Sequence, residues 1–143
     1  MLLINILLKE VTIIIKNNIS WAEFDDRLNE VFGKKMKYVD DLYFNVVKRI
    51  NVGEIICLED LGALKLLQDM YSMSGELCII TDYCYEKGCG PFIVEADEIS
   101  DFVKGFKKQY GNAFYSTDVI VINFMEKLIW VLFHEGICWL SKG

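Results

Sequence analysis

The chain has few residues of the kinds on which catalysis usually depends. Among its 143 residues there is one histidine, His134, and there are two arginines, Arg27 and Arg49. Hydrolases and phosphoryl-transfer enzymes usually need a positioned base and a cationic side chain that stabilises developing negative charge. Because both kinds of residue are scarce, the composition favours a binding protein over an enzyme.

Basic charge is scarce as well. The sequence has 15 Lys and Arg residues against 21 Asp and Glu residues, which gives a formal net charge of −6. Proteins that bind nucleic acid neutralise its phosphates with basic side chains, so this balance argues against a nucleic-acid partner. It favours either a basic protein partner or a role in solubility.

Proline is nearly absent, and no linker, repeat or low-complexity tract divides the chain. Pro91 is the single proline, and 53% of the residues are hydrophobic. A chain of this length can bury roughly 70% of the surface that its unfolded form would expose. We therefore expect one domain over residues 1–143, with no need for cross-links.

A long uninterrupted apolar run is missing too. Residues 1–15 are mostly apolar, but Lys9 and Glu10 divide them into pieces shorter than the ~20 residues that a membrane-spanning helix needs. No basic stretch precedes the run and no small-residue cleavage site follows it, as a signal peptide would require. We predict one or two buried strands here, no membrane association and a cytoplasmic location.

Cysteine occurs an odd number of times and at irregular spacing, as Cys57, Cys78, Cys84, Cys89 and Cys138. In a reducing cytosol such residues are buried hydrophobes or free thiols rather than disulfides. A zinc site made by Cys78, Cys84, Cys89 and His134 would need closer cysteine pairs, so we expect no metal and no other cofactor. Cys84 or Cys89 could instead act as a nucleophile with His134 as its base.

The only histidine lies in a short His-Glu-Gly sequence. His134 and Glu135 form an acid–base pair by residue type. The same residues are typical of a β-turn between two strands, in which Gly136 takes a positive φ. We favour the turn, with a structural or partner-contacting role.

Four segments have helical patterns. Ser20 and Glu23 have the spacing of a capping box and begin a helix that continues to about Phe32, before Gly33. A continuous apolar stripe predicts a helix over residues 97–110, ended by Gly111. A third helix is expected from residues 59–60 to residue 71. The fourth segment, residues 40–50, has helical spacing, but its aromatic and β-branched content also allows a strand.

Runs rich in β-branched residues predict short strands at residues 54–58, 77–81 and 92–95. Two longer apolar runs, residues 118–124 and 127–133, flank Met125 and Glu126 and predict a hairpin with a two-residue turn. Because these runs are apolar on both faces, they belong in the centre of a sheet that is covered on both sides. With a last strand at residues 137–140, the predicted fold class is α+β: a central, largely antiparallel sheet, three to four helices and a C-terminal hairpin or meander.

Acidic and aromatic residues gather between residues 82 and 101. This stretch has six acidic residues and one basic residue, Lys87, which gives a local charge of −5. Its first part, residues 82–91, is typical of a loop whose tyrosines offer contact area and whose carboxylates select a basic patch. A solvated surface is the alternative. The candidate partner-binding residues are Asp82, Tyr83, Tyr85, Glu86, Asp97, Glu98 and Asp101.

The stretch from Asp118 to Gly136, DVIVINFMEKLIWVLFHEG, combines an Asp-Val-apolar strand with a Lys-Leu-Ile-apolar strand that ends in His-Glu-Gly. It resembles the C-terminal hairpin of bacterial immunity proteins from contact-dependent growth-inhibition and related polymorphic toxin systems. The resemblance implies a protein that binds and neutralises a cognate toxin domain, often a basic nuclease, with no small-molecule substrate. The alternatives are a small enzyme that uses Cys89 or His134, and an adaptor subunit of a permanent complex.

Overall fold

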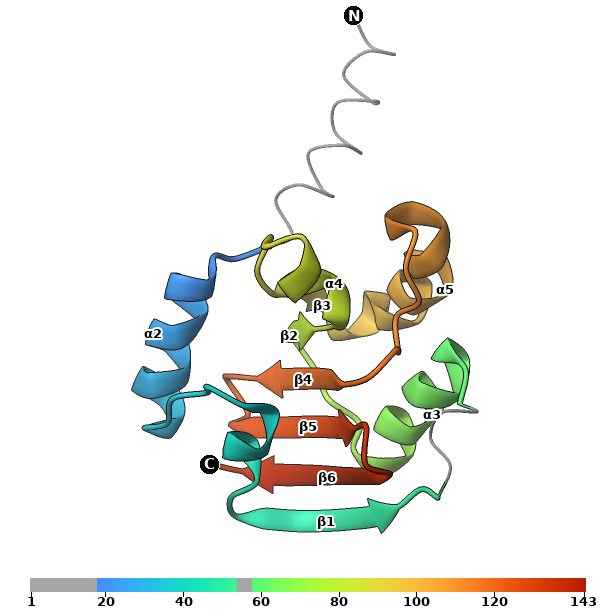
Figure 1. Ribbon diagram of the computed structural model, residues 1–143. Coiled ribbons are helices and arrows are strands. Elements are labelled where there is room, and N and C mark those ends of the chain that lie inside the picture. Colours follow the sequence, from blue (N-terminus) through green and yellow to red (C-terminus); the bar gives the residue numbers. More distant parts are fainter. Residues whose placement is uncertain (1–17, 54–57) are drawn as a thin grey trace, which may run out of the picture.

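The computed structural model describes residues 18–53 and 58–143. Within these ranges, six strands form one antiparallel sheet in the order β1-β6-β5-β4-β2-β3 (Figure 1). The strands are β1 (Val46–Asn51), β2 (Glu76–Ile80), β3 (Phe92–Glu95), β4 (Val119–Asn123), β5 (Leu128–Phe133) and β6 (Ile137–Lys142). The helices are α2 (Trp21–Phe32), η1 (Val39–Leu42), α3 (Asp60–Met70), α4 (Asp82–Glu86), η3 (Ala96–Glu98) and α5 (Ile99–Tyr110). The predicted α+β class is confirmed, and β4, β5 and β6 form the expected C-terminal meander.

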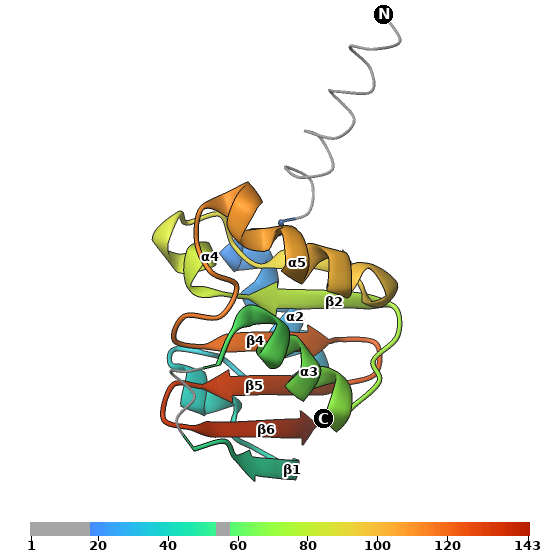
Figure 2. The ribbon, with the colours of Figure 1, turned by 90° about the vertical axis from the view of Figure 1, so that its right-hand side faces the viewer.

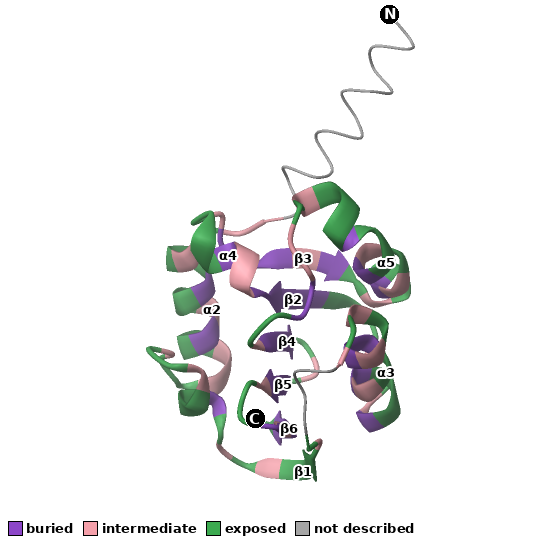
Figure 3. Cartoon of the chain, turned by 45° about the vertical axis from the view of Figure 1, so that its right-hand side comes forward, coloured by how far each residue is buried: buried purple, intermediate pink, exposed green. Residues whose placement is uncertain are grey.

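Helices cover both faces of the sheet. Helix α2 lies on one face, and α3 and α5 lie on the other (Figures 2 and 3). Every residue of β4 is buried, and so is every residue of β5 except Phe133. This burial confirms the prediction that these two strands occupy the centre of a sheet covered on both sides.

Two tryptophans point to opposite faces of the sheet. The indole N–H of Trp130 donates to the sulfur of Met70 in α3, at 3.2 Å. The indole N–H of Trp139 donates to the carbonyl oxygen of Leu42 in η1, also at 3.2 Å. Because successive side chains of a strand alternate between faces, Phe133 and Ile137 face the same side as Trp139. This is the side on which η1 lies.

Three of the four predicted helices are confirmed. The Ser20 hydroxyl accepts a hydrogen bond from the Glu23 N–H at 3.0 Å, and Gly33 ends α2 with φ +65°. Helices α3 and α5 lie within the predicted ranges, and Gly111 ends α5 with φ +78°. Local capping signals are therefore sufficient to place these helices. Among the described residues, no helix is both long and apolar enough to cross a membrane.

The predicted helix over residues 40–50 is wrong. Residues 39–42 form the short η1, Asn45 has a φ of +46°, and the chain then continues as β1. Strand β1 pairs with β6 from Val46 opposite Ser141 to Asn51 opposite Ile137. Pairing with a buried strand outweighs the helical spacing of these residues, so the strand alternative is right for residues 46–50.

Two loops also differ from expectation. The β4–β5 turn has four residues, 124–127, because Asn123 pairs with Leu128 and its side-chain oxygen accepts from the Glu126 N–H at 2.9 Å. The predicted loop at residues 82–91 begins instead with helix α4. The expected strand or strands over residues 1–15 lie outside the described residues, and so does the strand expected over residues 54–58 except for Leu58, which belongs to no strand. Gly136 has a φ of +86°, as predicted for the β5–β6 turn.

Candidate functional site

The β2–β3 hairpin separates the seven predicted partner-binding residues into two groups. Strand β2 leads into α4, whereas β3 leads into η3, and the two strands are antiparallel with Glu76 opposite Glu95 and Ile79 opposite Phe92. Helix α4 and η3 therefore lie at opposite ends of the hairpin. The structure places Asp82, Tyr83, Tyr85 and Glu86 at one end, and Asp97, Glu98 and Asp101 at the other.

The two carboxylates of α4 hold the segment that precedes β4. The carboxylate of Asp82 accepts hydrogen bonds from the Thr117 backbone N–H at 2.9 Å and from the Thr117 hydroxyl at 2.6 Å. The carboxylate of Glu86 accepts from the side-chain amide of Asn112 at 3.0 Å. Both groups therefore have a structural task, which anchors α4 against residues 112–117.

The two tyrosines of α4 have different surroundings. Tyr83 packs against Phe92, Phe106 and Tyr110, with ring centroids 4.9–6.2 Å apart, and so belongs to the interior. Tyr85 stacks on Trp21 of α2 at 4.9 Å and stays about half exposed. Partial burial raises the pKa of the Tyr85 hydroxyl to about 12.

Two adjoining hollows, each of about 450 Å³, lie on the face of the sheet that η1 covers. Asp40, Phe133 and Glu135 line both hollows. Tyr38 and Tyr85 line one of them, and Tyr43 lines the other beside Trp139. We call this surface the tyrosine groove and define it by Tyr38, Asp40, Tyr43, Tyr85, Phe133 and Glu135.

The tyrosines of the groove are the exposed tyrosines of the described chain. Tyr38 is 64% exposed, Tyr85 is 49% exposed and Tyr43 is 45% exposed. Every other tyrosine in the described ranges is buried or half-buried. Exposed aromatic rings that gather beside a hollow are typical of a contact surface for another molecule.

Hydrogen bonds fix the segment that carries Tyr38 and Tyr43. The carboxylate of Asp41 accepts from the backbone N–H groups of Lys37 and Tyr38, at 2.8 and 2.9 Å, and these bonds lower the pKa of that carboxyl. The carbonyl oxygen of Leu42 accepts from Trp139 and from the Ser141 hydroxyl. The groove is therefore built on backbone that the core holds in place.

The β5–β6 turn forms another wall of the groove. The Oδ1 atom of Asp118 accepts from the backbone N–H of His134 at 2.8 Å and lies 3.0 Å from the Nδ1 atom of its ring. The His134 ring packs against Phe133, with centroids 4.3 Å apart. A side chain at Gly136 would place its Cβ 2.8 Å from the carbonyl oxygen of Gly53, so this turn requires glycine.

Of the described cysteines, Cys78, Cys84 and Cys138 are buried, whereas Cys89 is half-buried. All four described cysteines are free, whereas Cys57 lies outside the described residues. Burial raises the pKa of Cys84 and of Cys138 to about 12, and it also raises the pKa of Cys78 and Cys89. A raised pKa opposes the thiolate that nucleophilic catalysis requires.

His134 has no thiol partner in the described ranges, since its side-chain hydrogen bond is to Asp118. The same ranges contain no group of three or more His, Cys, Asp or Glu side chains that could hold a metal ion. The geometry thus offers neither the Cys–His pair nor the zinc ligand set that the sequence allowed.

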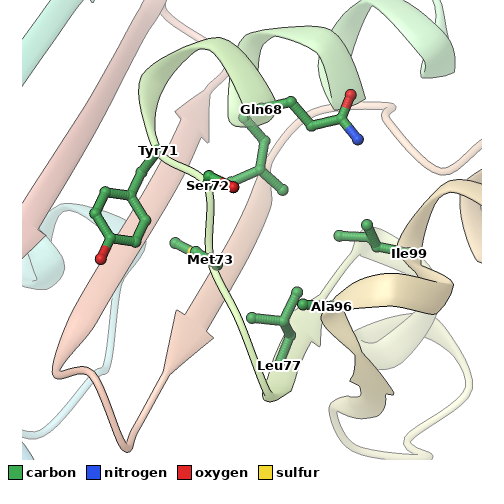
Figure 4. A pocket seen from close by; sticks show the side chains of 8 residues that line it. Gln68, Tyr71, Ser72, Met73, Leu77, Ala96 and Ile99 are labelled. Carbon is green, nitrogen blue, oxygen red and sulfur yellow. The ribbon is translucent and has the colours of Figure 1, made fainter.

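A smaller hollow of about 130 Å³ lies between the C-terminal end of α3 and the start of α5 (Figure 4). Its lining is mixed: Leu67, Met73, Leu77 and Ile99 contribute apolar surface, and Gln68 and Ser72 contribute polar surface. Pockets that bury drug-sized ligands are typically about 300–1,000 Å³, so this hollow is smaller than such a site. It lies beside the acidic group formed by Asp97, Glu98 and Asp101, since Ala96 and Ile99 line it.

Sequence reasoning found one of the groove tyrosines, Tyr85, and missed Tyr38, Asp40 and Tyr43. The wrongly predicted helix over residues 40–50 contained Asp40 and Tyr43 and made Tyr43 part of an apolar helix face, whereas Tyr38 precedes that segment. Neither the helix nor its strand alternative over residues 40–50 predicted residues 38–43 as a connection, although two tyrosines and two acids in a connection are a signal for a surface site.

No protein-family model, no characterised protein and no solved structure matches this chain.

Proposed function

We propose that this protein is an immunity protein, which binds and neutralises a cognate toxin domain by direct contact through the tyrosine groove. One observation carries the proposal: the three exposed tyrosines of the described chain line adjoining hollows beside Asp40 and Glu135. Tyrosine is enriched at the centres of protein interfaces, because its ring offers a large contact area and its hydroxyl offers a hydrogen bond.

The C-terminal hairpin supports the same proposal. The stretch from Asp118 to Gly136, which resembles immunity proteins, supplies Asp118, Phe133, His134 and Glu135 to the groove. The net charge of −6 suits a basic partner, such as a nuclease domain. In this proposal the protein acts in the cytoplasm, without catalysis, cofactor, nucleic acid, membrane or small-molecule substrate.

The binding mechanism follows from charge and rigidity. An acidic protein attracts a basic partner over several ångströms and so raises the association rate. Aromatic anchors that lose water on binding then slow dissociation. Because hydrogen bonds to Asp41 and Leu42 already fix the backbone around Tyr38 and Tyr43, little conformational entropy is lost on binding.

A stable complex needs more surface than the two hollows provide. Specific interfaces bury about 800 Å² on each partner. Helix α4 borders the groove through Tyr85, so its exposed surface can extend the contact, although Asp82 and Glu86 already accept hydrogen bonds from Thr117 and Asn112. The predicted acids at the far end of the hairpin, Asp97, Glu98 and Asp101, are not needed for this contact.

The test is protection from a toxin encoded beside this gene. The wild-type chain is expected to restore growth to cells that express the neighbouring toxin domain and to co-purify with that domain in a 1:1 complex. The double variant Tyr38→Ala/Tyr43→Ala should lose both effects, because it removes two of the three exposed rings of the groove.

A matched control removes exposed apolar side chains outside the groove. Leu61 and Met125 are both exposed, at 52% and 92%, and neither lines the groove. The variant Leu61→Ala/Met125→Ala should protect cells as well as the wild type does. Failure of the wild type to protect, or equal protection by the groove variant, would contradict the proposal.

A further inference from the structure

We infer that the tyrosine groove accepts an arginine side chain of the partner at the junction of its two hollows, between Asp40 and Glu135. This inference rests on the proposed function and makes it more specific. It names the chemistry of the contact: an exposed loop of the partner that places one guanidinium group over Phe133.

The junction has negative charge that the described chain does not neutralise. Asp40 and Glu135 line both hollows, and neither forms an ion pair with any cation of residues 18–53 or 58–143. A third carboxylate, that of Asp118, lines one of the hollows and already accepts from the backbone N–H of His134 and contacts its ring. Two carboxylates therefore remain available at the place where the hollows meet.

The two cations that line the hollows, Lys37 and Arg49, each contact a tyrosine ring. The Nζ atom of Lys37 lies over the ring of Tyr38, 5.6 Å from its centroid. Lys37 lines only one of the two hollows. Arg49 lies 5.8 Å from the ring centroid of Tyr43 and donates to its hydroxyl at 3.1 Å, and it lines only the other hollow. These cations do not line the side that the hollows share, so the shared side keeps its negative character.

The remaining surface of the junction favours arginine over lysine. Phe133 lines both hollows together with the two carboxylates, and its ring packs against His134 and Trp139. A guanidinium group is planar, stacks on aromatic rings and can donate to two carboxylates at once, whereas an ammonium group is a compact, strongly hydrated charge. An arginine thus matches both the ring and the paired acids.

The first experiment uses short peptides as probes and needs no toxin. The peptide acetyl-Gly-Ser-Arg-Ser-Gly-amide is titrated into the isotope-labelled full chain, and the backbone amide signals of Phe133 and Glu135 are followed by NMR. Saturable shifts are expected. The peptide with citrulline in place of arginine keeps the shape but lacks the charge, and it should bind at least tenfold more weakly.

A pair of variants tests the location. The change Asp40→Asn/Glu135→Gln should weaken binding of the arginine peptide at least tenfold. The matched control, Asp97→Asn/Glu98→Gln, removes the same charge from two exposed acids at the other end of the hairpin and should leave affinity within twofold. The inference would be overturned by no saturable shift, by an equal loss in both variants, or by equally tight binding of the peptide acetyl-Gly-Ser-Lys-Ser-Gly-amide.

The outcome is separable from that of the proposed function. If Asp40→Asn/Glu135→Gln protects cells as well as the wild type while Tyr38→Ala/Tyr43→Ala does not, the inference is overturned and the proposed function stands. If neither the wild type nor any variant protects cells, the proposed function fails. The peptide titration then still decides whether the groove binds arginine.

Discussion

Two groups of aromatic side chains in this protein have opposite environments. The first, which we call the ring cluster, lies between α4, β3 and α5 and consists of Tyr83, Phe92, Phe102, Phe106, Tyr110 and Phe114. Neighbouring rings in it have centroids 4.7–6.5 Å apart, and Phe92 and Phe106 are fully buried. The second group consists of the three tyrosines of the tyrosine groove, Tyr38, Tyr43 and Tyr85, which are about half exposed or more.

The difference follows from the backbone on which each group lies. Helix α5 places Phe102, Phe106 and Tyr110 at spacings of four residues, so that one helix face directs all three rings against the sheet. Tyr38 and Tyr43 instead flank the short η1, which has no such face. The ring cluster therefore supplies folding free energy, whereas the groove leaves its rings available to a partner.

The largest expected effect is on stability, in the ring cluster. Replacing Phe106 by Ala removes a fully buried ring and should lower the free energy of unfolding by about 4 kcal/mol. Replacing the exposed Tyr38 by Ala should change it by less than ~0.5 kcal/mol. Urea unfolding followed by tryptophan fluorescence measures both. A cost below ~1 kcal/mol for Phe106→Ala would remove the distinction between the two groups.

The neighbouring tyrosines of α4 sharpen the comparison within a single helix. Tyr83→Ala should lower the free energy of unfolding by about 2 kcal/mol, since it removes a half-buried ring of the ring cluster. Tyr85→Ala should lower the free energy of unfolding by clearly less than Tyr83→Ala does. Its main effect should be weaker toxin binding, since the Tyr85 ring lines the groove. The same unfolding series, combined with titration calorimetry, separates the two effects. A reversed order would show that Tyr85 is the structural residue.

A smaller effect is expected at Tyr43, where the ring and the hydroxyl can be tested separately. Tyr43→Ala should weaken the toxin complex roughly tenfold, or about 1.4 kcal/mol, by removing an aromatic anchor. Tyr43→Phe keeps the ring against Trp139 and loses only the hydrogen bond from Arg49, so its affinity should stay within about threefold of wild type. Surface plasmon resonance gives both constants, and equal losses would assign the contact to the hydroxyl.

The smallest effect concerns Tyr71, a tyrosine that belongs to neither group. Its hydroxyl donates to Glu126 at 2.8 Å, and the Ser74 N–H donates to the same carboxylate at 3.0 Å. These hydrogen bonds hold the pKa of Glu126 below its ordinary value of 4.5, and the bond from the Ser74 N–H has the largest effect. The stability that they contribute is therefore complete above pH 4.5 and is lost as the pH falls through the lowered pKa.

The variant Glu126→Gln tests this pH dependence. Its urea midpoint should lie below that of the wild type at pH 6, and the difference should shrink at pH 3. A difference that stays constant between these two pH values would show that the carboxylate charge is not responsible.

Sequence patterns located the elements whose signals are local. The caps at Ser20, Gly33 and Gly111 and the apolar stripe of α5 need only neighbouring residues, and all were predicted. The apolar composition of β4 and β5 placed them in the centre of the sheet. The predicted helix from Asp40 to Ile50 was wrong, because the secondary structure of this segment depends on pairing with β6, which lies about 90 residues further along the chain.

The candidate site shows the same division. Tyr85 and the acids between residues 82 and 101 were identified from composition alone, but their separation into two groups follows from the antiparallel β2–β3 hairpin. The tyrosine groove joins η1, α4 and the β5–β6 turn, which are distant in sequence. Tyr83 and Tyr85 look equivalent in sequence, and only packing against the ring cluster distinguishes them.

The sequence by itself determined the α+β class, the acidic charge, three helices and the central hairpin, because each of these depends on composition or on residues a few positions apart. Only the tertiary structure decided which tyrosines are exposed and which carboxylates lack a partner. Burial and hydrogen bonding depend on contacts between distant segments, as when the Leu42 carbonyl oxygen meets Trp139. Such contacts cannot be predicted from a local sequence pattern, and the groove is formed by contacts of this kind.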